Sequence, residues 1–406
     1  MADSTAYDSS NSRVEARAEQ PAVIAGALAA LALFVVYLSL AVGLRQAALA
    51  LIGAALGFAL YHAAFGFAAA YRRLIVERRG AGLRAQIVML GIAALAFAPL
   101  LSGGEAFGQP LGGALAPLGV SLLVGAFIFG VGMQLAGGCA SGTLYTVGGG
   151  STRMVIVLAS FVVGAYVGTW HLEWWHGRPA LDAIGLYADF GWVGGLALQV
   201  AIFGGLYLVT VLVERRRHGA IEGFEPGSVL RLSRIMRGPW PLLWGAVGLA
   251  LLNIATLLVA GRPWGITSAF ALWGAKLEAA AGADPRRFDY WQTAAPSAAL
   301  ERGLEHDITS VMNLGLVLGA LLAAGLAGRF APTLKIGGRP AFGALIGGLM
   351  LGYGARLAYG CNIGAFFSGV ASGSLHGWIW LLAALAGTIL GVRLRPFFGF
   401  AAEPAR

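Results

Sequence analysis

The sequence predicts an all-α protein that crosses a membrane many times. Of its 406 residues, 58% are hydrophobic and only 12% are charged, which is too little polar surface to cover a soluble core of this size. Several uninterrupted apolar runs approach or exceed the about 20 residues that a helix needs to span a bilayer. Its 62 glycines are too many for ordinary spanning helices, and they indicate close helix contacts and broken helices.

Eleven apolar runs give the predicted elements. In chain order they are 22–43, 47–70, 86–101, 118–136, 154–170, 193–213, 241–260, 265–273, 308–327, 341–359 and 375–394. Runs 22–43, 193–213 and 241–260 are continuous spans, whereas 47–70 carries glycines and His62. Run 265–273 is short and follows Arg262-Pro263. From these runs we predict five regions: a polar tail (1–20), a first membrane half (21–213), a basic linker (214–239), a second membrane half (240–396) and a C-terminal tail (397–406).

The composition also excludes several functions. The formal net charge of +9 fits basic cytoplasmic loops of a membrane protein, so we predict the lipid bilayer and no nucleic acid as a partner. The N-terminal residues lack the pattern of a cleaved signal peptide. No phosphate-binding loop, nucleophilic triad or dinucleotide fingerprint is present, and two cysteines without paired histidines make a poor zinc site. We therefore predict no cofactor, no metal and no enzymatic activity.

The two cysteines of the chain lie in similar surroundings. One pattern is Gly138-Cys139-Ala140-Ser141-Gly142 and the other is Gly360-Cys361-Asn362-Ile363-Gly364. At the same offset of 222 positions, glycines 125, 130 and 132 match glycines 347, 352 and 354. Such dense matching predicts an internal repeat.

Basic residues predict how the two halves are oriented. They gather in segments 72–84, 214–237 and 329–339 and near the C-terminus, and all of these should be cytoplasmic. A basic segment precedes the third apolar run in the first half but follows the matching run in the second half. This exchange of sides indicates an inverted repeat.

The number of crossings depends on runs 47–70 and 265–273. If both are re-entrant, nine spans remain, with the N-terminus periplasmic and the C-terminus cytoplasmic, and every basic loop lies on one side. If both are full spans, there are eleven crossings, and segment 280–307 joins the basic loops. We favour the re-entrant version, with Gly-Cys-x-x-Gly breaks inside the membrane.

The glycine-flanked cysteines are the predicted substrate site. Gly138, Gly142, Gly360 and Gly364 allow a helix to stop and restart inside the membrane, which is tolerated only where backbone is buried or lines a cavity. A restarted helix directs N–H groups and its positive dipole end toward the break, which attracts anions. The thiols of Cys139 and Cys361 add soft, weak donors suited to a sulfur-bearing anion. The alternative is that each cysteine is simply a small packed residue.

Polar neighbours extend this predicted site. Ser141 and Asn362 offer hydrogen bonds beside the two cysteines. Arg356 lies five positions before Cys361 inside an apolar run, where an ionisable group is costly and usually faces a cavity or a partner. It either attracts the anion, or it snorkels or pairs with backbone carbonyls.

The sequence resembles the YeeE/YedE family of sulfur-transport membrane proteins. Three segments carry the resemblance: the eight residues from Gly138 to Tyr145, the ten from Gly265 to Gly274, and the eighteen from Gly352 to Gly369. The resemblance implies a bacterial inner-membrane importer of thiosulfate or a related sulfur anion. It also implies an hourglass of inverted repeats, whose cysteines pass the substrate along by S–H···S contacts.

The resemblance has further implications and one departure. A small cytoplasmic sulfur carrier of the TusA type is an expected partner. A third family cysteine follows a phenylalanine, but here that pair reads Phe65-Gly66. This departure leaves open a selenium compound as substrate. A membrane thiol sulfurtransferase that carries a persulfide and an inert assembly subunit also stay open as functions.

Overall fold

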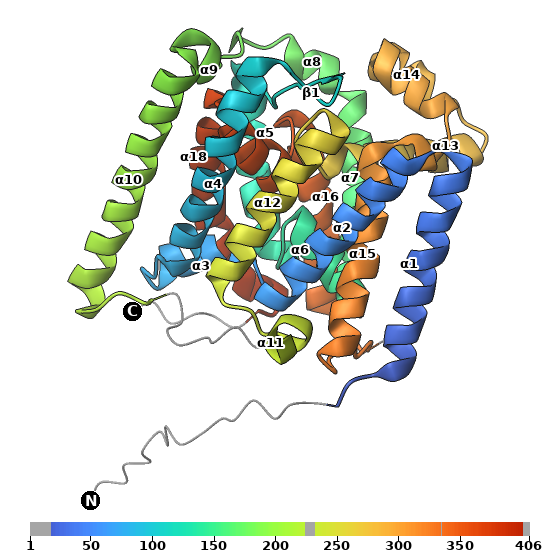
Figure 1. Ribbon diagram of the computed structural model, residues 1–406, viewed down its shortest axis with the longest axis horizontal. Helices are drawn as coiled ribbons and strands as arrows, with labels where there is room; N and C mark the ends of the chain where they lie inside the picture. The colour runs from blue at the N-terminus through green and yellow to red at the C-terminus, as the bar shows by residue number, and fades with distance from the viewer. Residues whose placement is uncertain (1–17, 224–231, 334, 401–406) are drawn as a thin grey trace, which may run out of the picture.

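Ten helical segments of the described residues are long and apolar enough to cross a membrane. The structure is a computed structural model that describes residues 18–223, 232–333 and 335–400 (Figure 1). The predicted polytopic helical class is confirmed. Parts of the predicted tails and of the basic linker lie outside the described residues.

The crossing segments are single helices or helices with one interruption. They are α1 (Pro21–Ala41), α2 (Leu44–Ala63) with α3 (Phe67–Val76), α4 (Ala81–Gly103), α5 (Val120–Ala136) with α6 (Ala140–Gly148), α7 (Thr152–Trp170), α10 (Gly191–His218), α12 (Leu242–Ala260), α15 (Ile308–Leu326), α16 (Gly338–Leu357) with the π-helix η4 (Asn362–Phe367) and α17 (Ser368–Ala371), and α18 (Leu375–Leu394).

Short elements connect these crossings. The helices are α8 (Leu172–His176), α9 (Leu186–Asp189), α11 (Leu232–Arg237), α13 (Thr267–Ala280) and α14 (Ala294–Glu301), with 3₁₀ turns η1 (Pro285–Arg287), η2 (Asp289–Gln292), η3 (Leu304–His306) and η5 (Arg395–Phe398). Two antiparallel pairs of two-residue strands join β1 (Glu105–Ala106) to β2 (Gln109–Pro110) and β3 (Leu118–Gly119) to β4 (Ala180–Leu181).

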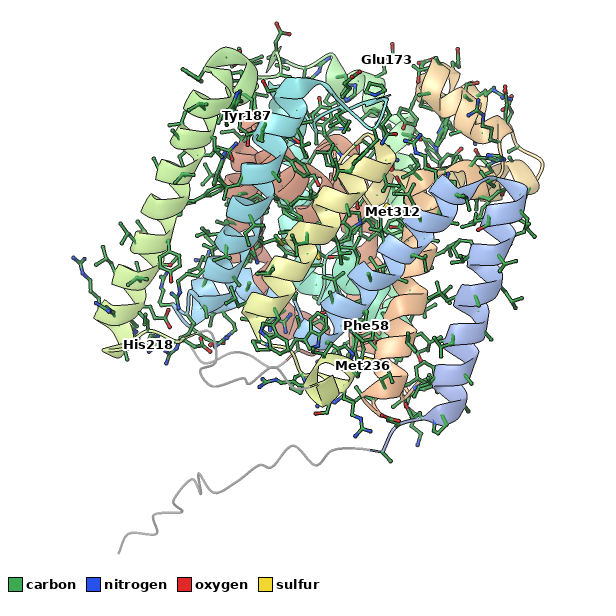
Figure 2. All side chains as sticks on the ribbon, viewed as in Figure 1. Phe58, Glu173, Tyr187, His218, Met236 and Met312 are labelled. Carbon is green, nitrogen blue, oxygen red and sulfur yellow. The ribbon has the colours of Figure 1, made fainter. Side chains whose placement is uncertain are left out.

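The two ends of the bundle differ in character. At one end, here called the basic end, the loops after α3, α10 and α15 meet the start of α1 and the end of α18. The opposite end, here called the distal end, carries α8, α9, α14 and the short strands (Figure 1). Figure 2 shows Glu173 at the distal end, and His218 and Met236 at the basic end.

Both described termini lie at the basic end. The Gln20 N–H, just before α1, donates to the Gly325 carbonyl at the end of α15 (3.0 Å). At the other terminus, Phe398 packs on Gly343 in the first turns of α16. The described residues thus hold ten candidate crossings, one more than the about nine spans that we expected, and both described termini lie at the same end of the bundle.

Run 47–70 accounts for the extra crossing. Within it α2 has 20 residues, which corresponds to about 30 Å and is enough to cross a bilayer. The chain then breaks at Ala64, which is left-handed, and α3 lies at the basic end. The glycines of this run mark a close helix contact and not a re-entrant turn.

Segment 261–280 behaves as the re-entrant prediction requires. It follows α12 at the distal end, enters the bundle and returns to the distal end through the 14-residue α13, which is too short to cross (Figure 1). Inside the bundle, Trp264 N–H donates to Asn253 Oδ1 (2.8 Å), and Asn313 Nδ2 donates to the Ile266 carbonyl (3.0 Å). The side-chain amides of Asn253 and Asn313 thus form hydrogen bonds with backbone groups of this segment, for which lipid offers no partner.

Segments related by the offset of 222 run in opposite directions. Helices α4, α5 and α7 correspond to α15, α16 and α18. Gly125 of α5 packs against Ala358 at the end of α16, whereas Gly132 packs against Gly347 nearer its start, so this pair is antiparallel. Opposite direction is what an inverted repeat requires. The repeat itself stays a prediction.

Glycines bring the central helices into backbone contact. Helices α2 and α15 run parallel, and a Cβ at Gly57 would overlap the Leu316 carbonyl oxygen. On the facing helix, a Cβ at Gly319 would overlap the Ala54 carbonyl oxygen. Small residues at helix contacts are the usual device in membranes, where close packing stabilises association.

We expect Gly57→Val to destabilise the bundle by about 1–3 kcal/mol or more, because neither backbone can move aside without losing its other contacts. The thermal midpoint of the purified variant in detergent measures this effect. Gly26→Val on α1 is the matched control, since nothing lies within 4 Å of a Cβ at Gly26. Equal midpoints for the two variants would contradict the packing argument.

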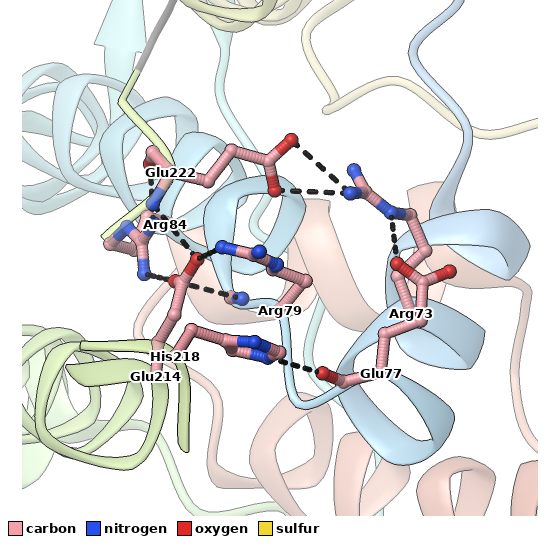
Figure 3. A network of polar contacts seen from close by, with 8 residues as sticks. Arg73, Glu77, Arg79, Arg84, Glu214, His218 and Glu222 are labelled. Carbon is pink, nitrogen blue, oxygen red and sulfur yellow. Dashed lines mark hydrogen bonds and ion pairs between the residues drawn. The ribbon is translucent and has the colours of Figure 1, made fainter. Parts of the chain in front are cut away.

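Helix α10 lies at the side of the bundle and is attached to it by a buried ion cluster (Figure 3). The Glu214 carboxylate is inaccessible and accepts hydrogen bonds from Arg84 (2.7 Å) and Arg79 (3.2 Å). It also accepts from the N–H groups of Gly80 (3.2 Å) and Glu222 (2.9 Å). Four donors therefore hold one carboxylate at the basic end.

Candidate functional site

The first predicted break interrupts the crossing formed by α5 and α6. Helix α5 ends at Ala136, Gly137 is left-handed (φ 79°), and Cys139 is the N-cap of α6. The Cys139 carbonyl accepts the Thr143 N–H (2.8 Å). The Cys139 Sγ lies 3.3 Å from Ser141 Oγ, and either atom can be the donor of this hydrogen bond.

The second break repeats this geometry. Helix α16 ends at Leu357, and Cys361 is the N-cap of η4. Tyr359 (φ 59°) and Gly360 (φ 148°) both have positive φ, which only glycine adopts freely. The backbone of Cys361 (φ −111°, ψ −167°) nearly matches that of Cys139 (φ −91°, ψ −168°). Each thiol therefore stands at the start of a restarted helix.

The two breaks meet inside the bundle. Helix α6, which starts after Cys139, contacts η4, which starts after Cys361. The Cys361 Sγ accepts the Ile363 N–H (3.4 Å). The side chains of Cys139, Cys361, Ser141 and Asn362 are at most 1% exposed. The thiols are thus sealed on both sides.

A cavity of about 270 Å³, here called the distal cavity, lies next to the second break. Segment 262–268 forms one wall, and Gly360, Gly364 and Arg356 contribute from the α16–α17 crossing. Arg262, on the first wall, donates to Thr309 Oγ1 (2.9 Å). Two guanidinium groups therefore lie on the approach to Cys361.

A second cavity of about 470 Å³, here called the basic-end cavity, adjoins the first break. Tyr145 and Thr146 of α6 line it, together with Arg153 of α7 and Lys335. Because α6 starts at Cys139, this cavity lies on the far side of that thiol from the distal cavity.

Arg356 faces the distal cavity. Its guanidinium donates to Tyr290 Oη (3.2 Å) and lies over that ring (4.9 Å), in the wall of the distal cavity and not at the thiols. Burial and, less strongly, the charge of Arg356 lower the pKa of His176, which stacks on Tyr359 at the same mouth. The positive charge of Arg356 therefore acts on groups at the mouth of the distal cavity.

The glycines of the predicted site have different neighbours. A Cβ at Gly142 would lie 3.6 Å from Cys139 Sγ, and one at Gly360 would lie 2.8 Å from the Ala365 nitrogen. Gly364 faces Gly265 of the re-entrant segment, at 3.9 Å. Gly138 packs against the first turn of α6. Gly142 thus keeps a side chain away from the Cys139 thiol, whereas Gly360 and Gly364 allow close approach of backbone.

Sequence reasoning missed Tyr71. This fully buried side chain comes from α3, and its Oη accepts the Asn362 Nδ2–H (3.3 Å). Since Tyr71 directly precedes Arg72-Arg73 in a basic loop, the sequence offered no sign that it reaches the centre of the bundle.

Ten candidate crossings, several of them interrupted inside the bundle, and two cavities near the buried thiols define a polytopic membrane protein. The chain belongs to the Sulphur transport family, whose sequence model matches residues 62–390.

Characterised relatives agree with this assignment. The chain is 28% identical over 277 residues to the thiosulfate transporter TsuA of Spirochaeta thermophila, covering 64% of this chain and 73% of that protein. To TsuA of Escherichia coli it is 24% identical over 366 residues, covering 82% and 90%. To the probable transporter YedE of Escherichia coli it is 30% identical over 161 residues, and this match spans 39% of each chain.

Proposed function

We propose that this protein imports a small sulfur-containing anion, with thiosulfate as the substrate. The supporting observation is the pair of N-cap thiols buried between two cavities. The relatives named as thiosulfate transporters support the choice of substrate. Because basic loops face the cytoplasm, import runs from the distal cavity to the basic-end cavity, and both described termini are cytoplasmic.

Charge brings the anion to the barrier. Arg262 and Arg356 in the distal cavity raise the local concentration of anions through their positive potential. The restarted helices then direct their free N–H groups and positive dipole ends at the breaks. The guanidinium groups thus attract the anion into the distal cavity, and the helix ends attract it at the breaks.

The thiols act on the soft end of the substrate. A thiosulfate ion carries a terminal sulfur that is more polarizable than its oxygens, and a thiol is a weak donor with a polarizable sulfur. Contacts of this kind lower the cost of removing the anion from water without binding it tightly. Passage requires such weak binding on both sides of the constriction.

The burial of the cysteines argues against the sulfurtransferase hypothesis. A persulfide carrier needs an accessible thiolate of low pKa, whereas both thiols here are inaccessible. The TusA-type carrier is part of the proposal as the cytoplasmic acceptor, which would meet the anion at the basic-end cavity.

Uptake of radiolabelled thiosulfate into liposomes that contain only this purified chain tests the proposal. We expect saturable uptake above that of empty liposomes. Liposomes that take up no thiosulfate would overturn it.

We expect Arg356→Gln to raise the KM for thiosulfate by about tenfold, because electrostatic attraction of the substrate changes association rates by at least this factor. The effect should shrink as the salt concentration increases, since salt screens the field. Arg178→Gln is the matched control, because Arg178 is exposed at the same end and stacks on Trp174. An equal KM for both variants would contradict a role for Arg356.

A further inference from the structure

Helix α3 is positioned to bring Tyr71 to the constriction. The Gln134 side chain, fully buried near the end of α5, donates through Nε2 to the Ala68 carbonyl of α3 (3.0 Å). Ala70 packs against Gly82 of α4, where a larger residue would overlap it. These contacts hold α3 against the first break, so that its tyrosine reaches Asn362 at the second.

The buried pair of Tyr71 and Asn362 has more donors than it uses. The phenol supplies one hydrogen and the amide two, and one hydrogen bond joins the residues. Among the described residues, neither side chain makes another hydrogen bond, and Asn362 Oδ1 has no partner. Turning the amide over exchanges the roles, but two donor hydrogens still remain unused.

Unused donors at this place need an explanation. Leaving a buried polar group unsatisfied costs about 1–3 kcal/mol, and most buried polar groups are paired. Both side chains are inaccessible, Asn362 directly follows Cys361 in the chain, and Tyr71 is hydrogen-bonded to Asn362. A passing anion with acceptor oxygens would satisfy them.

We propose that Tyr71 and Asn362 form an oxygen-binding station that receives the sulfonate end of thiosulfate while Cys139 and Cys361 contact its terminal sulfur. This inference rests on the proposed function and adds the orientation of the substrate. It also makes the phenol a further specificity-determining group. An anion with a soft sulfur but no oxygen would use the thiols alone.

Removing the phenol oxygen tests the station. We expect Tyr71→Phe to raise the KM for thiosulfate by about tenfold or more, because a hydrogen bond to a charged group is lost. Inhibition of uptake by thiocyanate, which has sulfur but no oxygen, should change much less. Tyr37→Phe is the matched control, since Tyr37 is 51% exposed on α1. Asn362→Ala is a second variant, which leaves the phenol in place and should also raise the KM.

The outcomes separate this inference from the proposed function. If the wild-type protein takes up thiosulfate and both Tyr71→Phe and Asn362→Ala keep its KM, the station is wrong and the transport function stands. If thiocyanate inhibition weakens as much as thiosulfate uptake, the phenol does not recognise oxygen and the orientation is wrong. If the wild-type protein takes up no thiosulfate, the proposed function fails first, and the station fails with it.

Discussion

Replacing Cys139 and Cys361 together by alanine should abolish thiosulfate uptake and leave a folded, inserted protein. Each thiol offers the anion a contact at the point where it has lost its water. A hydrogen bond to a charged group contributes about 1.5–3 kcal/mol, so losing two corresponds to about a hundredfold or more. Alanine removes only one buried sulfur at each position, so the effect on folding is small by comparison.

The measurement is initial uptake into liposomes, with size-exclusion chromatography and the thermal midpoint as checks of folding. The double variant lacks all cysteine, because the chain has only these two. Cys139→Ser and Cys361→Ser are matched controls that keep a donor but replace a soft atom with a hard one, and they should retain part of the uptake. Full uptake by the cysteine-free protein would refute the mechanism.

The same variants separate transport from sulfur transfer. If the thiols carried sulfur covalently, mass spectrometry of the wild-type protein after exposure to thiosulfate would detect a persulfide on Cys139 or Cys361. We expect no adduct, because attack on the terminal sulfur of thiosulfate requires a thiolate, and a charged sulfur is costly at an inaccessible position. A stoichiometric persulfide would favour a sulfurtransferase.

The second large effect is on stability. Glu214→Gln should destabilise the protein by about 3–5 kcal/mol, because it leaves the buried Arg84 guanidinium without its counter-charge. Glu214 and Arg84 are 0% and 2% exposed, so water cannot replace the lost interaction. The loss should loosen α10 from the bundle (Figure 3). Thermal unfolding in detergent measures the total effect.

Glu77→Gln is the control from the same cluster. Glu77 pairs with Arg73 four residues earlier, but both are exposed, by 46% and 38%. Pairs of this kind contribute about 0–1 kcal/mol. Similar midpoints for Glu214→Gln and Glu77→Gln would show that the buried pair does not attach α10.

The prediction from sequence was most accurate where local chemistry determines structure. Both helix breaks lie beside the glycine-flanked cysteines, because glycine alone tolerates the positive φ found at Gly137 and Gly360. Segment 261–280 returns to its own end of the bundle because α13 is too short to cross.

Run 47–70 was misjudged for a physical reason. Its glycines serve the contact between α2 and α15, and sequence alone does not distinguish a glycine that allows packing from one that breaks a helix. For Arg356 the sequence left open whether it attracts the anion or snorkels, and the structure places it in the wall of the distal cavity. Tyr71 was missed because its partner Asn362 lies 291 positions away.

The amino-acid sequence by itself determined the membrane class, the helix interruptions and the positions of the two thiols. These follow from the length of apolar runs and from backbone stereochemistry, which act over a few residues. The tertiary structure alone decided the number of crossings, the two cavities and the meeting of Tyr71 with Asn362. Such features depend on how deeply each segment lies in the bundle and on which distant segment it packs against, and no short stretch of sequence carries that information.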